Sequence, residues 1–187
     1  MKLKQLIGAE ASGEKGEFTV ANLTADSRKV KPGTVFVALK GLAVDGHDFI
    51  PAALEQGALA VVAGHSVDTR DVPLLIASET RAWLAGAAAR FYQDQPGTVV
   101  AITGTNGKSS SVDFLRQIWA GAGLKAASLG TLGAIGPSGT VDLGHTTPDP
   151  VAIHETLAAL ARQGVSHLAM EASSHGLEQH RLDGVRL

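Results

Sequence analysis

The stretch Thr98-Val-Val-Ala-Ile-Thr-Gly-Thr-Asn-Gly-Lys-Ser-Ser-Ser111 decides the fold. Its first five residues are mostly β-branched and apolar, which is typical of a short buried parallel strand. Residues 112–122 carry apolar side chains at the spacing of one helix face: Phe114, Leu115, Ile118 and Trp119. The glycine-bracketed turn between them is therefore predicted to lie at the C-terminal end of a strand, where open α/β sheets bind ligands.

The residue types of this turn suit a phosphate-binding loop. Gly104 and Gly107 permit close backbone approach, so that successive N–H groups can surround an anion. Lys108 would place a positive charge on the β- and γ-phosphates, and the Ser109 hydroxyl would face Mg²⁺. The common pattern G-x-x-x-x-G-K-[ST] needs glycine where this chain has Ile102, so the loop is a variant. The alternative is a glycine turn with a solvated lysine.

Residues 103–110 closely resemble the ATP loop of the Mur ligases and of their relatives, the folylpolyglutamate synthases. These enzymes form amide bonds through an acyl phosphate. The resemblance implies ATP and Mg²⁺ as cofactors, with Lys108 as a catalytic residue. It also implies an ATP-binding set made of Gly104, Thr105, Asn106, Gly107, Lys108, Ser109 and Ser110.

Composition excludes several other classes of protein. The 187 residues have a formal net charge of -2, which gives neither a basic surface for nucleic acid nor a polybasic membrane patch. Cysteine is absent, which removes disulfides and thiolate metal sites. The N-terminus does not have the pattern of a secretory signal, and no stretch approaches the roughly 20 apolar residues that span a bilayer. We expect a cytoplasmic monomer whose partners are small molecules.

Two strands are predicted before residue 40, at 18–23 and 34–39, and the turn between them contains Asp26-Ser-Arg28. By residue type this segment is an ordinary hydrogen-bonded turn. Together with Pro32 to Leu39 and Asp45 to Ile50, however, it resembles the N-terminal domain of the Mur ligases, which holds the uridine nucleotide of the substrate. The resemblance implies that Ser27 contacts the UDP-sugar. It further implies that the uracil pocket is lined by Leu42, Ala43 and Val44.

The domain organisation follows from a polar break. A strong helix is predicted to begin at Thr80, and Gln93-Asp-Gln-Pro-Gly97 ends its apolar pattern just before the phosphate-loop strand. We therefore predict an N-terminal α/β UDP-substrate-binding domain at 1–93 and a linker at 94–97. Residues 98–187 would be the N-terminal part of an ATP-binding P-loop domain with a mostly parallel sheet, truncated before its end.

A carboxylate follows the strand predicted at His167 to Met170. Glu171 would lie at the same sheet edge as the phosphate loop, where it can reach a Mg²⁺ held by Ser109 and ATP oxygens. Earlier, residues 131–143 have the pattern of a hairpin, and Asp149-Pro150 suits the start of a helix over 151–163. By resemblance to the family, Thr146 and Thr147 would hold the muramoyl-peptide part of the substrate.

The Ser- and His-rich segment 170–182 does not match a serine-hydrolase triad, because no G-x-S-x-G elbow is present. His175 and His180 lack a third ligand at a familiar zinc spacing. The segment instead closely resembles the signature of one branch of the Mur ligases, the branch that extends UDP-N-acetylmuramoyl-L-alanyl-D-glutamate. This implies substrate binding by Ser173, Gln179 and Arg181.

The resemblance implies a ligase of peptidoglycan precursor synthesis. ATP would phosphorylate the D-glutamate γ-carboxylate, and the amine of a diamino acid, meso-diaminopimelate or L-lysine, would attack the acyl phosphate. We expect this chain to be inactive by itself, because the family continues beyond its last residue. The alternatives are a non-catalytic UDP-sugar or nucleotide-binding module, another Mur ligase or folylpolyglutamate synthase, and, less favoured, a small-molecule P-loop kinase.

Overall fold

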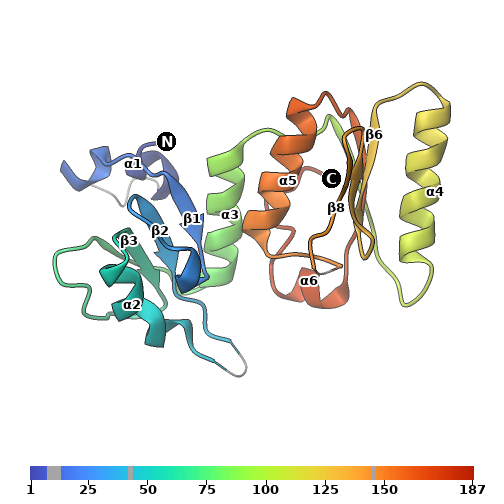
Figure 1. Cartoon of the computed structure of the whole chain (residues 1–187). Coiled ribbons are helices and arrows are strands. Elements are labelled where there is room, and N and C mark those ends of the chain that lie inside the picture. The colour runs from blue at the N-terminus through green and yellow to red at the C-terminus, as the bar shows by residue number, and fades with distance from the viewer. Residues whose placement is uncertain (8–13, 42–43, 145) are drawn as a thin grey trace. The chain divides into compact units, whose positions relative to one another are not determined.

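The chain forms two α/β units, Met1–Phe91 and Tyr92–Leu187, each with its own sheet (Figure 1). This computed structural model describes residues 1–7, 14–41, 44–144 and 146–187. Among the residues it describes, no helix is long and apolar enough to cross a membrane. The predicted α/β fold class is confirmed.

The first unit is built on a four-stranded sheet of order β1-β2-β3-β4, in which all neighbours are parallel. Its elements are α1 (Leu3–Ile7), β1 (Asn22–Thr24), β2 (Thr34–Val37), α2 (Ile50–Glu55), β3 (Ala58–Ala63), β4 (Leu74–Ile76) and α3 (Thr80–Tyr92). Short 3-10 segments lie at Glu14–Glu17, Ser27–Lys29 and Gly46–Phe49. The buried side chains of Phe36, Val61 and Ile50 join strands and helix in one apolar core.

The strand predicted at 18–23 is wrong at its start, because β1 begins at Asn22. The backbone before it pairs with the N-terminus instead: the Val20 N–H donates to the Met1 carbonyl, and the Leu3 N–H donates to the Phe18 carbonyl. An alternating pattern predicts extended backbone but does not identify the partner strand.

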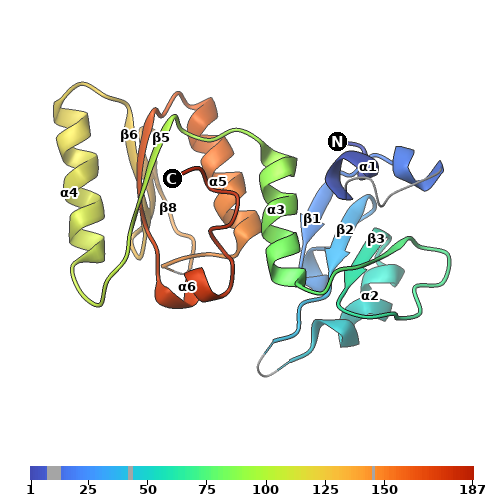
Figure 2. The same cartoon turned by 180° about the vertical axis from the view of Figure 1, so that it is seen from behind.

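The second unit contains β5 (Thr98–Ile102), α4 (Lys108–Gly121), β6 (Ala126–Gly130), β7 (Gly133–Gly136), β8 (Gly139–Val141), α5 (Pro150–Arg162), β9 (His167–Glu171) and α6 (Ser174–Glu178). The strand order is β5-β9-β6-β7-β8. The first three strands are parallel, and the predicted hairpin β7–β8 adds two antiparallel strands. Helices α4 and α5 cover opposite faces of this sheet (Figures 1 and 2).

Strand β9 inserts between β5 and β6, so three strand ends from distant parts of the chain become neighbours. Ile102 pairs with Glu171, and Leu129 pairs with Met170 one residue before the ends of β6 and β9. We call the edge formed by Ile102, Gly130 and Glu171 the carboxyl edge. Loop 103–107 and α6 lie at this end of the sheet (Figure 2).

The predicted apolar face of α4 is only partly covered. Leu115 and Trp119 are half-buried on the side of Val112, the helix's buried residue, whereas Phe114 is 62% and Ile118 66% exposed. The four residues have the predicted helical spacing, but two of them are not covered in this structure. Residues 112, 115 and 119 share a line along the helix, and residues 114 and 118 are rotated away from it.

Helix α5 begins as predicted, because the Asp149 carboxylate accepts bonds from the N–H groups of Val151 and Ala152. Its inner face buries His154, which is 1% exposed and whose Nε2 lies 3.0 Å from the Asp183 carbonyl oxygen. With Nε2–H as the donor, the helix is tied to the last turn of the chain.

Burial lowers the pKa of His154 below its usual 6.5. The folded state therefore holds a neutral imidazole, whereas the unfolded chain takes up a proton as the pH falls. We expect the stabilising contribution to be complete above pH 6.5 and to be lost as the pH decreases below it. Thermal melts between pH 7.5 and 5 should show a steeper loss of Tm for the unmodified chain than for His154→Gln. Equal slopes would contradict this prediction.

Candidate functional site

The strand, turn and helix predicted around residues 98–111 are present. Strand β5 ends at Ile102, residues 103–107 are exposed, and α4 begins at Lys108. Gly104 and Gly107 have φ of 142° and 80°, values that favour glycine, so both positions need that residue for the turn. No side chain caps α4, which leaves the N–H groups of its first turn for an anion.

Lys108 lies over its own loop. Its Nζ donates to the Gly104 carbonyl oxygen at 2.6 Å. Ser109 and Ser110 follow in the first helical turn, and Thr105 and Asn106 belong to the exposed loop. The seven residues predicted to bind ATP therefore form one continuous turn around the start of α4.

Glu171 ends β9 beside this loop. The Ala172 N–H donates to the Ile102 carbonyl at 2.9 Å, which joins the two strand ends directly. The Glu171 residue is only 2% exposed, and its carboxylate accepts bonds from Thr131, at 2.8 Å from the backbone N–H and 3.3 Å from the hydroxyl. A carboxylate has about four lone-pair directions, and these two bonds use two of them, so acceptor capacity for a cation remains.

Thr147 organises the residues that follow β9. Its buried hydroxyl donates to the Glu171 carbonyl at 3.3 Å and accepts from the Ser173 N–H at 3.1 Å. Gly176 lies against it so closely that a Cβ there would meet Thr147 Cγ2 at 2.6 Å. This close approach fixes α6 against Thr147.

Arg181 closes the same cluster. Its Nη1 donates to the Thr147 carbonyl at 2.6 Å, and its Nε and Nη2 donate to Gln179 Oε1 at 3.2 and 2.7 Å. A guanidinium has five N–H donors, so two remain for an anionic group. Ser173 caps α6 by accepting from the Gly176 N–H at 3.0 Å, and its own hydroxyl proton stays free to donate.

The structure thus brings together, at the carboxyl edge, the loop 104–110, Glu171, Thr146, Thr147, Ser173, Gln179 and Arg181. Sequence reasoning missed Gly130 and Thr131, which contact Glu171. A signal for them was available, because a Gly-Thr pair directly follows the mainly apolar run Ala126-Ala-Ser-Leu129.

The predicted site residues of the first unit are described within that unit. Ser27 begins the 3-10 turn Ser27–Lys29, whose cap is the Asp26 carboxylate. Arg28 donates to both oxygens of that carboxylate, at 2.9 and 2.8 Å, and this pairing lowers the pKa of Asp26. Val44 is 56% exposed, and Leu42 and Ala43 lie outside the described residues. The hydrogen-bonded turn expected from residue types is therefore present, with Ser27 on it.

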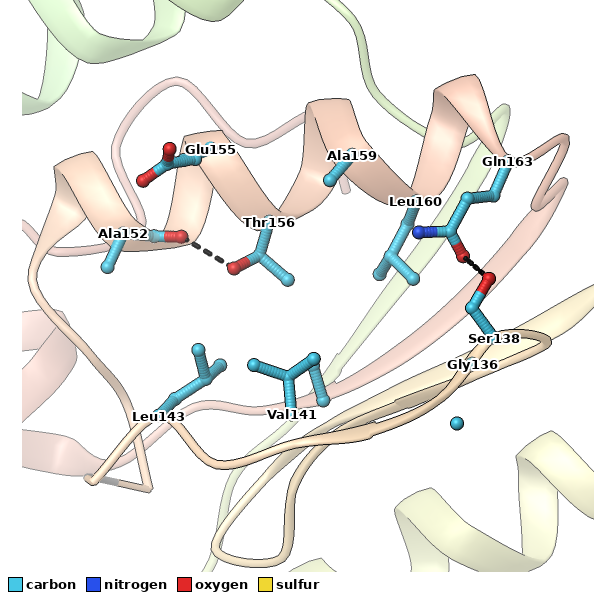
Figure 3. Close-up of a pocket in the computed structure, with 12 residues that line it drawn as sticks. Gly136, Ser138, Val141, Leu143, Ala152, Glu155, Thr156, Ala159, Leu160 and Gln163 are labelled. Carbon is cyan, nitrogen blue, oxygen red and sulfur yellow. Dashed lines mark hydrogen bonds between the residues drawn. The ribbon is translucent and has the colours of Figure 1, made fainter.

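A separate cavity of about 280 Å³ lies between the β7–β8 hairpin and α5 (Figure 3). Its walls are mainly apolar, from Val141, Leu143 and Leu160 among others. Two of its polar groups are engaged within the walls: Ser138 Oγ donates to Gln163 Oε1 at 2.9 Å, and Thr156 Oγ1 donates to the Ala152 carbonyl. It shares no lining residue with the carboxyl-edge cluster.

The described residues hold no group of three or more His, Cys, Asp or Glu side chains arranged for a metal ion. His180 Nδ1 instead lies 2.9 Å from an Asp183 carboxylate oxygen. A magnesium ion on a nucleotide needs only one or two protein oxygens, because phosphates and water supply the others. The Ser109 hydroxyl and the Glu171 carboxylate are oxygen groups of this kind at the carboxyl edge.

Two family models match the chain. The model described as the Mur ligase middle domain matches residues 102–187, and the model described as the Mur ligase family, catalytic domain, matches residues 19–92. Both sites discussed above fall inside these ranges.

Two relatives of this chain carry the same name. Over 187 residues the chain is 52% identical to the UDP-N-acetylmuramoyl-L-alanyl-D-glutamate--2,6-diaminopimelate ligase of Agrobacterium fabrum. This match covers 100% of this chain and 37% of that protein. The protein of the same name from Bradyrhizobium diazoefficiens is 49% identical over 189 residues, covering 100% and 39%. The chain therefore spans about two fifths of the length of these relatives.

Solved structures of Mur ligases have folds similar to that of this chain. A structure of a ligase of that same name matches with a TM-score of 0.82 and 28% identity, covering 98% of this chain and 38% of that one. MurF ligase from Thermotoga maritima matches with a TM-score of 0.61 and 24% identity over 93% and 36%, which shows a shared fold.

Proposed function

We propose that this chain is the N-terminal portion of an ATP-dependent amide ligase, because it belongs to the Mur ligase family and carries that family's N-terminal and middle domains. The substrate is UDP-N-acetylmuramoyl-L-alanyl-D-glutamate, and the amino acid added is 2,6-diaminopimelate, as the names of its relatives indicate. The reaction belongs to peptidoglycan precursor synthesis and uses ATP and a nucleotide-linked sugar, so we place it in the cytoplasm.

The observation that carries this proposal is the pairing of Ile102 with Glu171. It sets the loop that begins at Thr103 beside the polar cluster that follows β9. A phosphate-binding turn and groups suited to a carboxylate substrate therefore share one edge of one sheet, which is where phosphoryl transfer between ATP and a carboxylate needs them.

In the proposed reaction, the D-glutamate γ-carboxylate attacks the γ-phosphorus of ATP and releases ADP. The amine of diaminopimelate then attacks the acyl carbon, phosphate leaves, and an amide bond forms. Lys108 neutralises the transferring phosphoryl group, and the loop N–H groups hold the other phosphates. Arg181, Gln179 and Ser173 orient the muramoyl-peptide acceptor, with Thr146 beside them.

Magnesium fits the residues present, since the Ser109 hydroxyl and the Glu171 carboxylate are the hard oxygen donors that this ion prefers. When bound, it would neutralise charge on the nucleotide phosphates. Glu171 and Ser109 would hold it.

Calorimetric titration with UDP-N-acetylmuramoyl-L-alanyl-D-glutamate tests the substrate assignment. We expect saturable binding, weakened about tenfold by Ser27→Ala, because a hydrogen bond to a charged group contributes about 1.5 kcal/mol or more. The matched control is Ser138→Ala, which removes a hydroxyl from the hairpin and should leave the affinity unchanged. A folded chain that binds Mg·ADP but not this substrate would contradict the substrate and favour a nucleotide-binding module.

A further inference from the structure

Gly130 is the last residue of β6 and Thr131 follows it, and neither residue has a role in the function proposed above. Strand β6 pairs with β9 so that Leu129 lies opposite Met170. The next residue of each strand, Gly130 and Glu171, therefore lies at the carboxyl edge. The chain separates Thr131 from Glu171 by 40 positions, yet the two residues are hydrogen-bonded.

The Glu171 carboxylate rests directly on Gly130. A Cβ at position 130 would lie 2.2 Å from Glu171 Oε1 and 2.6 Å from its Cγ. These separations are far below van der Waals contact, so no other residue type at 130 allows this position of the carboxylate. Glycine is thus required there by the glutamate and not by backbone dihedral angles.

Thr131 then holds both oxygens of that carboxylate. Its backbone N–H donates to Oε1 at 2.8 Å, and its hydroxyl donates to Oε2 at 3.3 Å. Two donors from one residue fix the rotation of the carboxylate plane, which a single bond would leave free. The remaining lone pairs of the Glu171 carboxylate therefore have a fixed direction.

The Thr131 hydroxyl has a second neighbour, Thr146 Oγ1, at 3.0 Å. A hydroxyl donates one proton, so a Thr131 that donates to Glu171 must accept from Thr146. The order of donation is Thr146 to Thr131 to Glu171. Thr146, a residue of the proposed acceptor site, is thereby connected through Thr131 to Glu171, the proposed metal ligand. The hydroxyl proton that Thr146 donates keeps the Thr131 hydroxyl directed at Glu171.

We propose that Thr131 is a positioning residue that orients Glu171 toward the divalent cation of the bound nucleotide. This inference rests on the function proposed above. Removing the hydroxyl leaves the backbone N–H bond but frees the carboxylate to rotate, so the cation should bind more weakly while the phosphates keep their loop contacts. Thr131 is exposed, so the fold should tolerate its replacement.

The test is a Mn²⁺ titration in the presence of ADP, followed by the electron paramagnetic resonance signal of free Mn²⁺. The isosteric Thr131→Val should weaken Mn²⁺ binding about tenfold, the value expected for a lost hydrogen bond to a charged group. Thr131→Ser, which retains the hydroxyl, should stay within about twofold. Affinity for ADP measured in EDTA should be the same for all three proteins.

Two further measurements sharpen the test. In a Glu171→Gln background, Thr131→Val should have no additional effect on Mn²⁺ binding, because the group that it orients is no longer a charged ligand. Thr131→Ala should repeat the result of the valine variant, and thermal melts establish that both are folded. Equal Mn²⁺ affinities for the valine, serine and unmodified proteins would overturn this inference alone. Absence of ADP-dependent Mn²⁺ binding by the unmodified protein would overturn the proposed function together with it.

Discussion

Lys108→Ala is expected to weaken Mg·ADP binding by at least about 100-fold, or about 2.7 kcal/mol, because a charge-assisted contact to the phosphates is lost in a loop with no other lysine. The free energy of unfolding should change by less than about 0.5 kcal/mol, since the bond from this side chain to the Gly104 carbonyl lies in an exposed loop. Titration of the folded variant with a fluorescent ADP analogue measures the first quantity, and chemical denaturation measures the second.

The matched control for this prediction is Lys125→Ala. Lys125 immediately precedes β6, so it lies at the opposite end of the parallel strands from Lys108. Its removal takes away the same charge from the whole molecule but none from the phosphate loop. Equal affinities for Mg·ADP in the unmodified and Lys108→Ala proteins would reduce the loop to a glycine turn with a solvated lysine.

The parts of the site that could be predicted from the sequence are those carried by short, continuous segments. The β-branched run ending at Ile102, the two glycines and Lys108 predict strand, loop and helix start together, because each is a local preference of the backbone or of an anion site. The start of α5 is similar, since Asp149 caps the helix and Pro150 is its first residue.

The parts that could not be predicted depend on which segments become neighbours. Thr131 belongs to a segment with the pattern of a hairpin, and only the insertion of β9 between β5 and β6 brings it to Glu171. Helix α4 shows the same limit of pattern reasoning: helical spacing groups Phe114 with Leu115, but the position of the helix axis over the sheet decides which of them is covered. Strand order and helix placement arise from packing, which a one-dimensional pattern does not specify.

Arg181→Ala is expected to weaken binding of UDP-N-acetylmuramoyl-L-alanyl-D-glutamate by about 100-fold. Three N–H groups of the guanidinium donate to Thr147 and Gln179, and these bonds fix its plane. The other two N–H groups can donate to an anion. A planar group held in this way is suited to bidentate binding of a carboxylate or phosphate, and alanine removes both the charge and the geometry. Arg181→Lys should recover only part of the affinity, because an ammonium cannot reproduce two parallel bonds.

Calorimetry with the three proteins measures these affinities, and Arg116→Ala on α4, where Arg116 pairs with Asp113, serves as the arginine control. The bond from Arg181 to Thr147 also contributes to stability, so each variant's Tm must be compared with its affinity. A lower Tm with unchanged substrate affinity would assign Arg181 to holding Thr147 in place. A loss of affinity in a protein that still binds Mg·ADP would place Arg181 on the substrate, since the phosphate loop reports that the second unit remains folded.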